Sequence, residues 1–253
     1  MRTARDVRVL RLHGDRFLVV GCDSCGGIGP KRLDMVRVSG QVVGKFTARV
    51  ALMEVLSTGA TPIFLAATMS VEPAPTGDDI LKGIEEEVKT LNLPSRLVMT
   101  GSSEKNFPVE QTGLGVTVVG TVASSKLKIG CSIAGDIAVS IGLPVVGEEV
   151  LAAEKKRLIA DLRDLQKLLR ERFIHEVIPA GSKGILHEAN TVADDSKLSF
   201  MPEEDTEIET DRPAGPATVL VATLPSMRLH ALRKTTSKPV SVIGHLWSKG
   251  KWS

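Results

Sequence analysis

The sequence has little of several residue types, and each shortage excludes a class of protein. It contains no tyrosine, and aromatic residues make up only 3% of its 253 residues. Surfaces that stack nucleic-acid bases depend on aromatic side chains, and nucleic-acid-binding domains usually carry a clear basic excess. Here 32 basic residues nearly cancel 30 acidic ones, which leaves a formal net charge of +2. We therefore expect no nucleic-acid partner.

Cysteine and long apolar runs are also scarce. Three cysteines are too few for a disulfide-stabilised scaffold, which fits a reducing compartment. No apolar run approaches the roughly 20 residues of a membrane-spanning helix, so we expect no membrane partner. The segment MRTARDVRVLRLHGDR at the start of the chain is too charged for the apolar core of a signal peptide. The sequence therefore predicts a cytoplasmic protein.

The remaining composition is that of a globular protein with a core. Hydrophobic residues make up 42% of the chain and charged residues 25%. The length suits one large domain or two small ones. The small, polar and basic segment Ala123–Gly130 is the predicted boundary, which divides the chain into domains 1–126 and 127–253. Strands and helices mix in both halves, so the predicted fold class is α/β or α+β.

Short apolar runs between turn residues predict strands, and apolar residues at helical spacing predict helices. In the first half we expect strands at 7–12, 16–22, 63–69, 96–100 and 114–122, and helices at 41–58 and 76–93. In the second half we expect strands at 136–140, 217–223 and 239–247, helices at 148–173, 182–194 and 226–235, and a loop at 201–216. The long helix 148–173 should bury a stripe made of Leu158, Leu162, Leu165, Leu169 and Phe173.

A glycine-rich loop after the second predicted strand is the strongest local signal of a binding site. The segment reads Asp23-Ser24-Cys25-Gly26-Gly27-Ile28-Gly29-Pro30-Lys31. Glycines let backbone N–H groups approach an anion because no Cβ is in the way. Lys31 adds a cation for a phosphate, and Asp23 offers the carboxylate oxygens that Mg²⁺ prefers. A tight turn that merely requires glycine is the alternative explanation of the same pattern.

Two other motif matches fail. The segment Gly40–Thr47 is one residue short of a P-loop, and Phe46 stands where a serine or threonine should bind Mg²⁺. The C-x-x-C of Cys22 and Cys25 lies at a strand end instead of a helix start, and no second pair completes a zinc site. No two of the five histidines share metal-ligand spacing. We therefore expect neither redox chemistry nor a zinc site.

Several segments together resemble the family of aminoimidazole-ribonucleotide (AIR) synthetase and its relatives. The segment Asp23–Lys31 is similar to the family's loop, and Ala51–Pro62 is similar to a helix motif in which an acidic residue precedes a Gly-Ala-x-Pro turn. Thr100–Glu104 stands where relatives such as thiamine-monophosphate kinase carry a Gly-Gly-Asp-Thr turn. Gly115–Val122 resembles the strand that closes the family's first domain, and Ala134–Ile137 resembles the opening of its second.

The sequence departs from the family pattern at three places. Glu54 replaces the usual aspartate, Ser102-Ser103-Glu104 replaces the Gly-Asp-Thr, and Ser182–Ile185 replaces an Asp-Gly-Gly turn. Among short members of the family, the whole pattern is most similar to kinases of α-ribazole, the riboside of 5,6-dimethylbenzimidazole used in cobalamin assembly. A ligase of the AIR-synthetase type, an enzyme like thiamine-monophosphate kinase and a nucleotide-binding assembly protein without turnover remain alternatives.

The resemblance implies a fold, a reaction and a set of site residues. The fold would be two α/β domains, the first of which pairs into a homodimer with ATP near the interface. The reaction would transfer the γ-phosphoryl of ATP, with Mg²⁺, to an oxygen of a nucleoside-like small molecule. The Mg²⁺ ligands would be Asp23, Glu54 and Glu104, with Asp34 as a weaker fourth. The ATP contacts would be Gly26, Gly27, Gly29, Lys31, Gly101, Ser102 and Ser103. No general base stands out, and the weak candidates are Asp194, Asp195 and His187.

Overall fold

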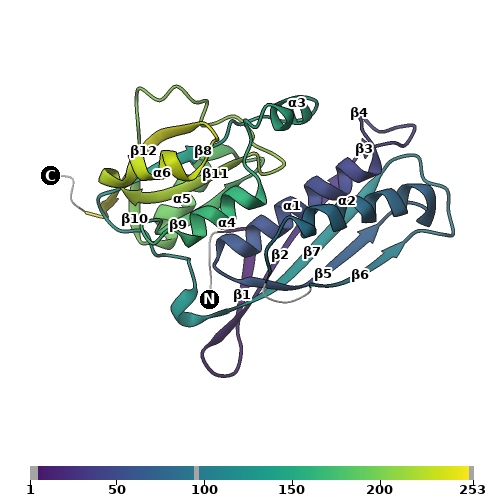
Figure 1. The fold of residues 1–253 in the computed structure, drawn as a ribbon, viewed down its shortest axis with the longest axis horizontal. Coiled ribbons are helices and arrows are strands. Elements are labelled where there is room, and N and C mark those ends of the chain that lie inside the picture. The colour runs from purple at the N-terminus through teal and green to yellow at the C-terminus, as the bar shows by residue number, and fades with distance from the viewer. Residues whose placement is uncertain (1–4, 94–96, 251–253) are drawn as a thin grey trace. The chain divides into compact units, whose positions relative to one another are not determined.

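Two five-stranded sheets organise the chain, one in each of two structural units (Figure 1). The computed structural model describes residues 5–93 and 97–250. The N-terminal unit comprises residues 6–56 and 60–124, and the C-terminal unit comprises Arg5, residues 57–59 and residues 125–250. Each unit combines a sheet with helices, so the mixed α/β class predicted from the sequence is confirmed.

The sheet of the N-terminal unit has the strand order β1-β2-β7-β5-β6. Neighbouring strands are antiparallel except β5 and β6, which are parallel. A separate parallel pair joins β3 (Ile28–Gly29) to β4 (Val36–Arg37). Of the predicted strand 96–100, Arg96 lies outside the described residues. The five strands are β1 (Val7–Arg11), β2 (Arg16–Gly26), β5 (Thr61–Met69), β6 (Val98–Ser103) and β7 (Gly113–Ala123).

Helices α1 (Gly40–Ser57) and α2 (Asp78–Lys89) pack closely against each other in this unit (Figure 1). A Cβ at Gly44 of α1 would collide with the backbone carbonyl of Ile80 in α2. A buried ion pair joins the helices as well, since Arg49 Nε donates to Glu87 Oε1 at 2.7 Å. The glycine that suggests a P-loop in the sequence therefore serves helix packing.

The sheet of the N-terminal unit has one covered face and one open face. Along β7 the even-numbered residues from Leu114 to Val122 are buried, whereas the odd-numbered residues are half-buried. Helix α1 packs on the side of the even-numbered residues, where a Cβ at Gly120 would lie 2.6 Å from Val55 Cγ1. We call the side of the odd-numbered residues the open face. Its apolar residues include Leu10, which is 52% exposed, together with Leu18, Val20, Phe64 and Val119.

The sheet of the C-terminal unit is antiparallel throughout, with the order β10-β12-β8-β11-β9. Helix α5 (Gly184–Asp195) packs its Ile185, Ala189 and Val192 against Ile178 and Val221 of the sheet. The bounds of the strands are Asp136–Ile141 for β8, Glu176–Ala180 for β9, Leu198–Pro202 for β10, Val219–Pro225 for β11 and Val240–Ser248 for β12.

The prediction of one long helix at 148–173 is wrong. The segment forms α3 (Glu149–Lys155) and α4 (Leu162–Arg170), and α4 packs against β9 and the short helix α6 (Leu229–Thr235). The break has a local cause, because Asp161 begins a new helix. Its Oδ1 accepts N–H groups of Arg163 at 2.9 Å and Asp164 at 3.0 Å, and Asp164 Oδ2 accepts the N–H of Asp161 in return. Within α4, Leu168 is buried and Leu169 only half-buried, contrary to the predicted stripe.

Other boundaries also differ from prediction. Strand β9 was not predicted, and β10 occupies the start of the segment 201–216 that was expected to be a loop. Helix α2 ends at Lys89, four residues before the predicted end. Among the described residues, no helix has the length and apolar character needed to cross a membrane.

Candidate functional site

The glycine-rich segment begins inside a strand. Strand β2 continues through Gly26, so Cys25 and Gly26 belong to the sheet and the predicted loop starts only at Gly27. The N–H of Gly27 donates to Thr112 O at 3.0 Å, which ties the turn to the segment before β7. Gly29 has φ +150°, and a Cβ there would lie 2.9 Å from Asp34 Oδ2 and would also meet Thr112. The turn therefore requires glycine at position 29, because any side chain there would collide with Asp34 and Thr112.

Asp34 holds this turn in shape. Its side chain is buried, and it accepts hydrogen bonds from Lys31 N at 2.8 Å, Thr112 N at 2.8 Å and Thr112 Oγ1 at 2.7 Å. Both carboxylate oxygens thus have protein donors. Asp34, the fourth predicted Mg²⁺ ligand, is engaged in a structural role in this arrangement.

The side chain of Lys31 forms an ion pair with Glu72, which follows β5. Thr76 Oγ1 donates to the same carboxylate, at Glu72 Oε1, with a distance of 2.5 Å. Burial acts to raise the pKa of Glu72, but the hydrogen bonds from Lys31 and Thr76 outweigh it and lower the pKa to about 2. The predicted phosphate-binding cation is therefore held beside the turn by an ionised acid.

Asp23 lies on the covered face of the sheet, next to α1. It pairs across the sheet with the buried Val116, and its side chain is half-buried. Burial raises the pKa of Asp23 to about 6, and a hydrogen bond from the backbone of Ser24 opposes that rise. Glu54 of α1 lies beside Gly21, where a Cβ would be 3.2 Å from the Glu54 Cβ. Asp23 and Glu54 thus belong to the same seam between β2 and α1.

The predicted Mg²⁺ ligands do not form one cluster. Glu104 follows β6, where its N–H donates to Met69 O at 3.2 Å and Val71 O at 2.9 Å, and its Oε1 accepts from Asn106 N at 2.6 Å. Gly101, Ser102 and Ser103 lie on β6, which pairs with β5 only. Across residues 5–93 and 97–250, no three His, Cys, Asp or Glu side chains gather closely enough to hold a metal ion.

The two cysteines of the C-x-x-C point to opposite sides of β2. Cys22 pairs with Thr117 on the open face, and Cys25 pairs with Leu114 on the covered face. Burial, followed by the charge of Asp23, raises the pKa of the Cys25 thiol to about 11, although a hydrogen bond with Thr47 opposes the change. A protonated thiol on the far side of the strand from its neighbour is unsuited to redox exchange.

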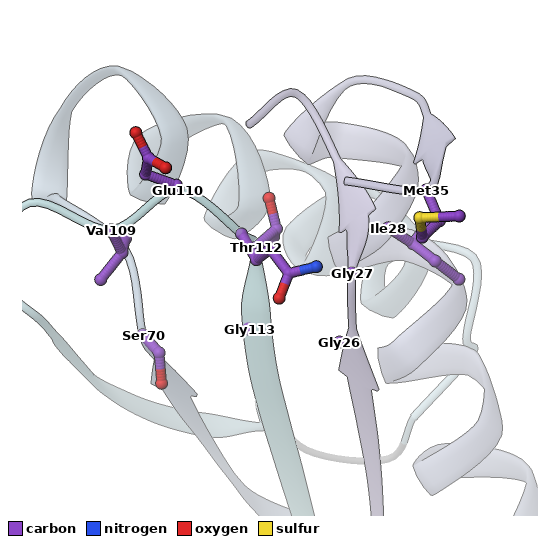
Figure 2. A pocket seen from close by; sticks show the side chains of 10 residues that line it. Gly26, Gly27, Ile28, Met35, Ser70, Val109, Glu110, Thr112 and Gly113 are labelled. Carbon is purple, nitrogen blue, oxygen red and sulfur yellow. The ribbon is translucent and has the colours of Figure 1, made fainter. Parts of the chain in front are cut away.

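A hollow of about 640 Å³ lies at the end of the sheet where β2 and β5 finish and β7 begins (Figure 2). Ser70 borders it directly after β5, and its N–H donates to Gly113 O at 2.8 Å. Gly26 and Gly27 were predicted site residues, whereas Ser70 and Gln111 were not, because neither belongs to a recognisable motif. The full lining consists of Gly26, Gly27, Ile28, Met35, Ser70, Val109, Glu110, Gln111, Thr112 and Gly113.

The three general-base candidates lie on α5 in the C-terminal unit and do not form a common site. Asp194 is exposed and pairs with Lys249 at 3.1 Å. Asp195 accepts from Arg5 Nε at 3.3 Å, as part of a buried cluster built on Glu176. His187 is exposed.

The C-terminal unit also contains a contact between a histidine and an aspartate that the sequence did not predict. His175 Nδ1 lies 2.7 Å from the buried Asp136 Oδ2. The two residues are 39 positions apart, so no local pattern could reveal the contact.

Comparison with known proteins agrees with this description of the fold. Residues 4–122 match the family model of the AIR synthase related protein, N-terminal domain. No curated protein matches the sequence.

Solved structures match nearly the whole chain. A HypE–HypF complex matches with a TM-score of 0.67 and 14% identity, over 97% of this chain and 88% of the other. Thiamine-monophosphate kinase from Stenotrophomonas maltophilia K279a matches with a TM-score of 0.64 and 17% identity, over 97% and 90%. The hydrogenase maturation protein HypE in complex with ATP matches with a TM-score of 0.63 and 17% identity, over 98% and 81%. At these identities the likeness establishes the mixed α/β fold.

Proposed function

We propose that this protein is an ATP-dependent kinase of a small molecule and that it transfers the γ-phosphoryl group to a hydroxyl of a nucleoside. The proposed acceptor is α-ribazole, which would become α-ribazole 5′-phosphate. The observation that carries the proposal is the turn Gly27–Lys31 at the end of β2, within the segment that matches the AIR synthase-related domain. The likeness of fold to a thiamine-monophosphate kinase supports the reaction class, and the likeness to HypE in complex with ATP supports ATP as the nucleotide.

The residues of the turn suggest how a triphosphate would be bound. The N–H groups of Gly27 and Lys31 already donate to Thr112 and Asp34, so they are not available to wrap an anion. The side chain of Lys31 would therefore supply the contact, by exchanging Glu72 for a phosphate oxygen. An ammonium group in that position acts as a point charge that neutralises the anion.

Asp23 and Glu54 are the residues that would hold Mg²⁺. A half-buried carboxylate whose pKa is raised by desolvation gains most from a nearby cation, which fits Asp23 to this role. When bound, Mg²⁺ would neutralise phosphate charge between these acids and the nucleotide. The acids themselves keep the metal side of the site anionic, and Lys31 keeps the turn cationic, which orients the nucleotide between them.

Incubation with Mg·ATP and single acceptors, followed by mass spectrometry, tests the proposal. The panel should contain α-ribazole, adenosine, thiamine monophosphate and an amide substrate of the AIR-synthetase type. The proposed kinase adds one phosphoryl group to a hydroxyl of the nucleoside and releases ADP without free phosphate. Release of ADP together with phosphate would indicate a ligase, and release of neither would indicate a nucleotide-binding protein without turnover. Either of the last two results would refute the proposal.

A further inference from the structure

The hollow beside the turn differs in charge from the place where the phosphates are proposed to bind. Of the ten residues that line it, Glu110 alone is ionisable, and its carboxylate pairs with the exposed Arg32. Lys31 lies outside this lining. A phosphate group placed in the hollow would meet a carboxylate and no lining cation. The hollow is therefore unsuited to the anionic part of a nucleotide.

The apolar part of the lining suits a flat ring. Ile28 and Met35 come from the turn side, and Val109 comes from the segment before β7 (Figure 2). Their side chains offer apolar contact, while Gly26, where an added Cβ would meet nothing within 4 Å, leaves room for a ligand to approach the backbone. The volume of about 640 Å³ lies within the range of roughly 300–1,000 Å³ that is usual for small-molecule pockets.

Apart from Glu110, the polar side chains of the lining are neutral. Gln111 Nε2 donates to Leu33 O at 3.0 Å, which orients the amide and leaves its carbonyl and its second N–H for a ligand. The hydroxyl of Ser70 adds a group that can donate and accept. Thr112 Oγ1 is engaged with Asp34 at 2.7 Å and serves the turn instead. Neutral donors and acceptors at the rim of an apolar hollow match the edge of a ring that contains nitrogen.

We propose that the hollow binds an uncharged aromatic heterocycle of a nucleoside, with its ring against Ile28, Met35 and Val109 and its polar edge at Gln111. This inference rests on the proposed function, because two nucleosides then enter the reaction. One source of such a ring is the adenine of ATP, and the other is the base of the acceptor. The chemistry of recognition is the same for both, so the experiment must separate them.

Direct titration with uncharged probes tests the inference without any turnover. The probes are adenosine and α-ribazole, with ribose 5-phosphate as a probe that lacks the ring. Gln111→Leu removes the amide while keeping a similar volume, and Met35→Glu adds a carboxylate at a side chain that is 83% exposed. Phe107→Glu is the matched control, since Phe107 is 73% exposed, lies in the same unit and does not line the hollow. All three positions are at the surface, so the variants should fold.

We expect Gln111→Leu and Met35→Glu to weaken binding of one probe about tenfold, which is the scale of one lost polar contact or of an unfavourable charge. Phe107→Glu should bind as the unaltered protein does. If the affected probe is adenosine, the hollow holds the adenine of ATP; if it is α-ribazole, the hollow holds the base of the acceptor.

Two outcomes would overturn the inference. One is unchanged affinity for both probes in both hollow variants, and the other is an equal loss in the Phe107→Glu control. Failure of the proposed function is seen separately, as an absence of phosphorylated product from every acceptor. The unaltered protein could phosphorylate an acceptor while both hollow variants keep their affinities for the probes. That combination would refute only the proposal that the hollow binds the ring.

Discussion

Replacing Asp23 by asparagine should stabilise the protein at neutral and alkaline pH while removing the proposed kinase activity. The ordinary pKa of an aspartate is 3.8, and burial raises that of Asp23 to about 6 in the folded protein. The folded state therefore holds the proton more tightly than the unfolded state. Below pH 3.8 both states are protonated and the residue has no effect on stability. As the pH rises from 3.8 to about 6, the unfolded state gains from ionisation first, and folding stability is lost.

The magnitude follows from the same two values. A difference of about two pH units corresponds to about 3 kcal/mol at 1.36 kcal/mol per unit, and partial exposure to water reduces this to about 2–3 kcal/mol. Asparagine has nearly the same shape and no charge, so Asp23→Asn should recover this free energy above pH 6. For a protein of this size, the midpoint of thermal unfolding should rise by roughly 5–10 °C at pH 8. Near pH 3.5 the two proteins should unfold at similar temperatures.

Thermal unfolding recorded from pH 3.5 to pH 8, with and without Mg²⁺, checks this reasoning. Mg²⁺ should stabilise the unaltered protein at pH 8 and should have less effect on Asp23→Asn, because a ligand stabilises only the state that binds it. Turnover of Asp23→Asn should fall about 10²-fold or more, the usual scale for loss of a preorganised charged group. Glu54→Gln should also lose turnover and need more Mg²⁺ for half its maximal rate. A variant that is no more stable at pH 8, or a difference that persists at pH 3.5, would refute the electrostatic argument.

Three further predictions concern other parts of the molecule. Glu72→Gln should release Lys31 and tighten binding of inorganic triphosphate several-fold in a titration, with about 1 kcal/mol or less of lost stability because the pair is partly exposed; weaker binding would mean that Glu72 positions Lys31 instead. The double change Cys22→Ser plus Cys25→Ser should keep most of the turnover of ATP in a coupled assay, because the thiols lie on opposite faces of β2; complete loss with an intact fold would contradict this. The open face of the N-terminal sheet should form a homodimer, so sedimentation at micromolar concentration should give about twice the chain mass, and a monomer under those conditions would be evidence against pairing.

Elements with strong local patterns were predictable from the sequence. Helix α1 and strand β7 were predicted within one residue at each end, because an apolar pattern runs through each and turn residues bound it. The long helix 148–173 was wrong for a different reason. Its apolar stripe fits a continuous helix, but the pair Asp161 and Asp164 forms a capping box that starts a new helix inside the stripe. The two aspartates were visible in the sequence, but the helical spacing of the apolar residues favoured one continuous helix.

Strand β9 could not be predicted, because its stability depends on a distant part of the chain. The strand contains Glu176, whose side chain is fully buried, and Pro179, a residue that suits only an edge strand. Arg5 compensates the buried charge, with Nη2 2.5 Å from Glu176 Oε1, and the N–H groups of Gly130 and Ser132 donate to the same carboxylate. A buried acid in a strand looks unfavourable until these partners are known. No pattern in the sequence connects residues 171 positions apart.

The roles of residues at the candidate site also depend on contacts that the sequence does not reveal. The sequence identified the glycines and Lys31 as one motif and Asp34 as a weaker metal ligand, but residue type alone could not assign the role of each. Hydrogen bonds to Asp34 show that the turn is closed by its own carboxylate, so its glycines serve its shape first. Its charge for a ligand is then concentrated in the side chain of Lys31, while Asp23, whose pKa is raised by burial, lies on the covered face of β2. Because a triphosphate needs cations and its Mg²⁺ needs carboxylate ligands, a lysine at the turn and a desolvated acid in the seam with α1 are what phosphoryl transfer would require of this unit.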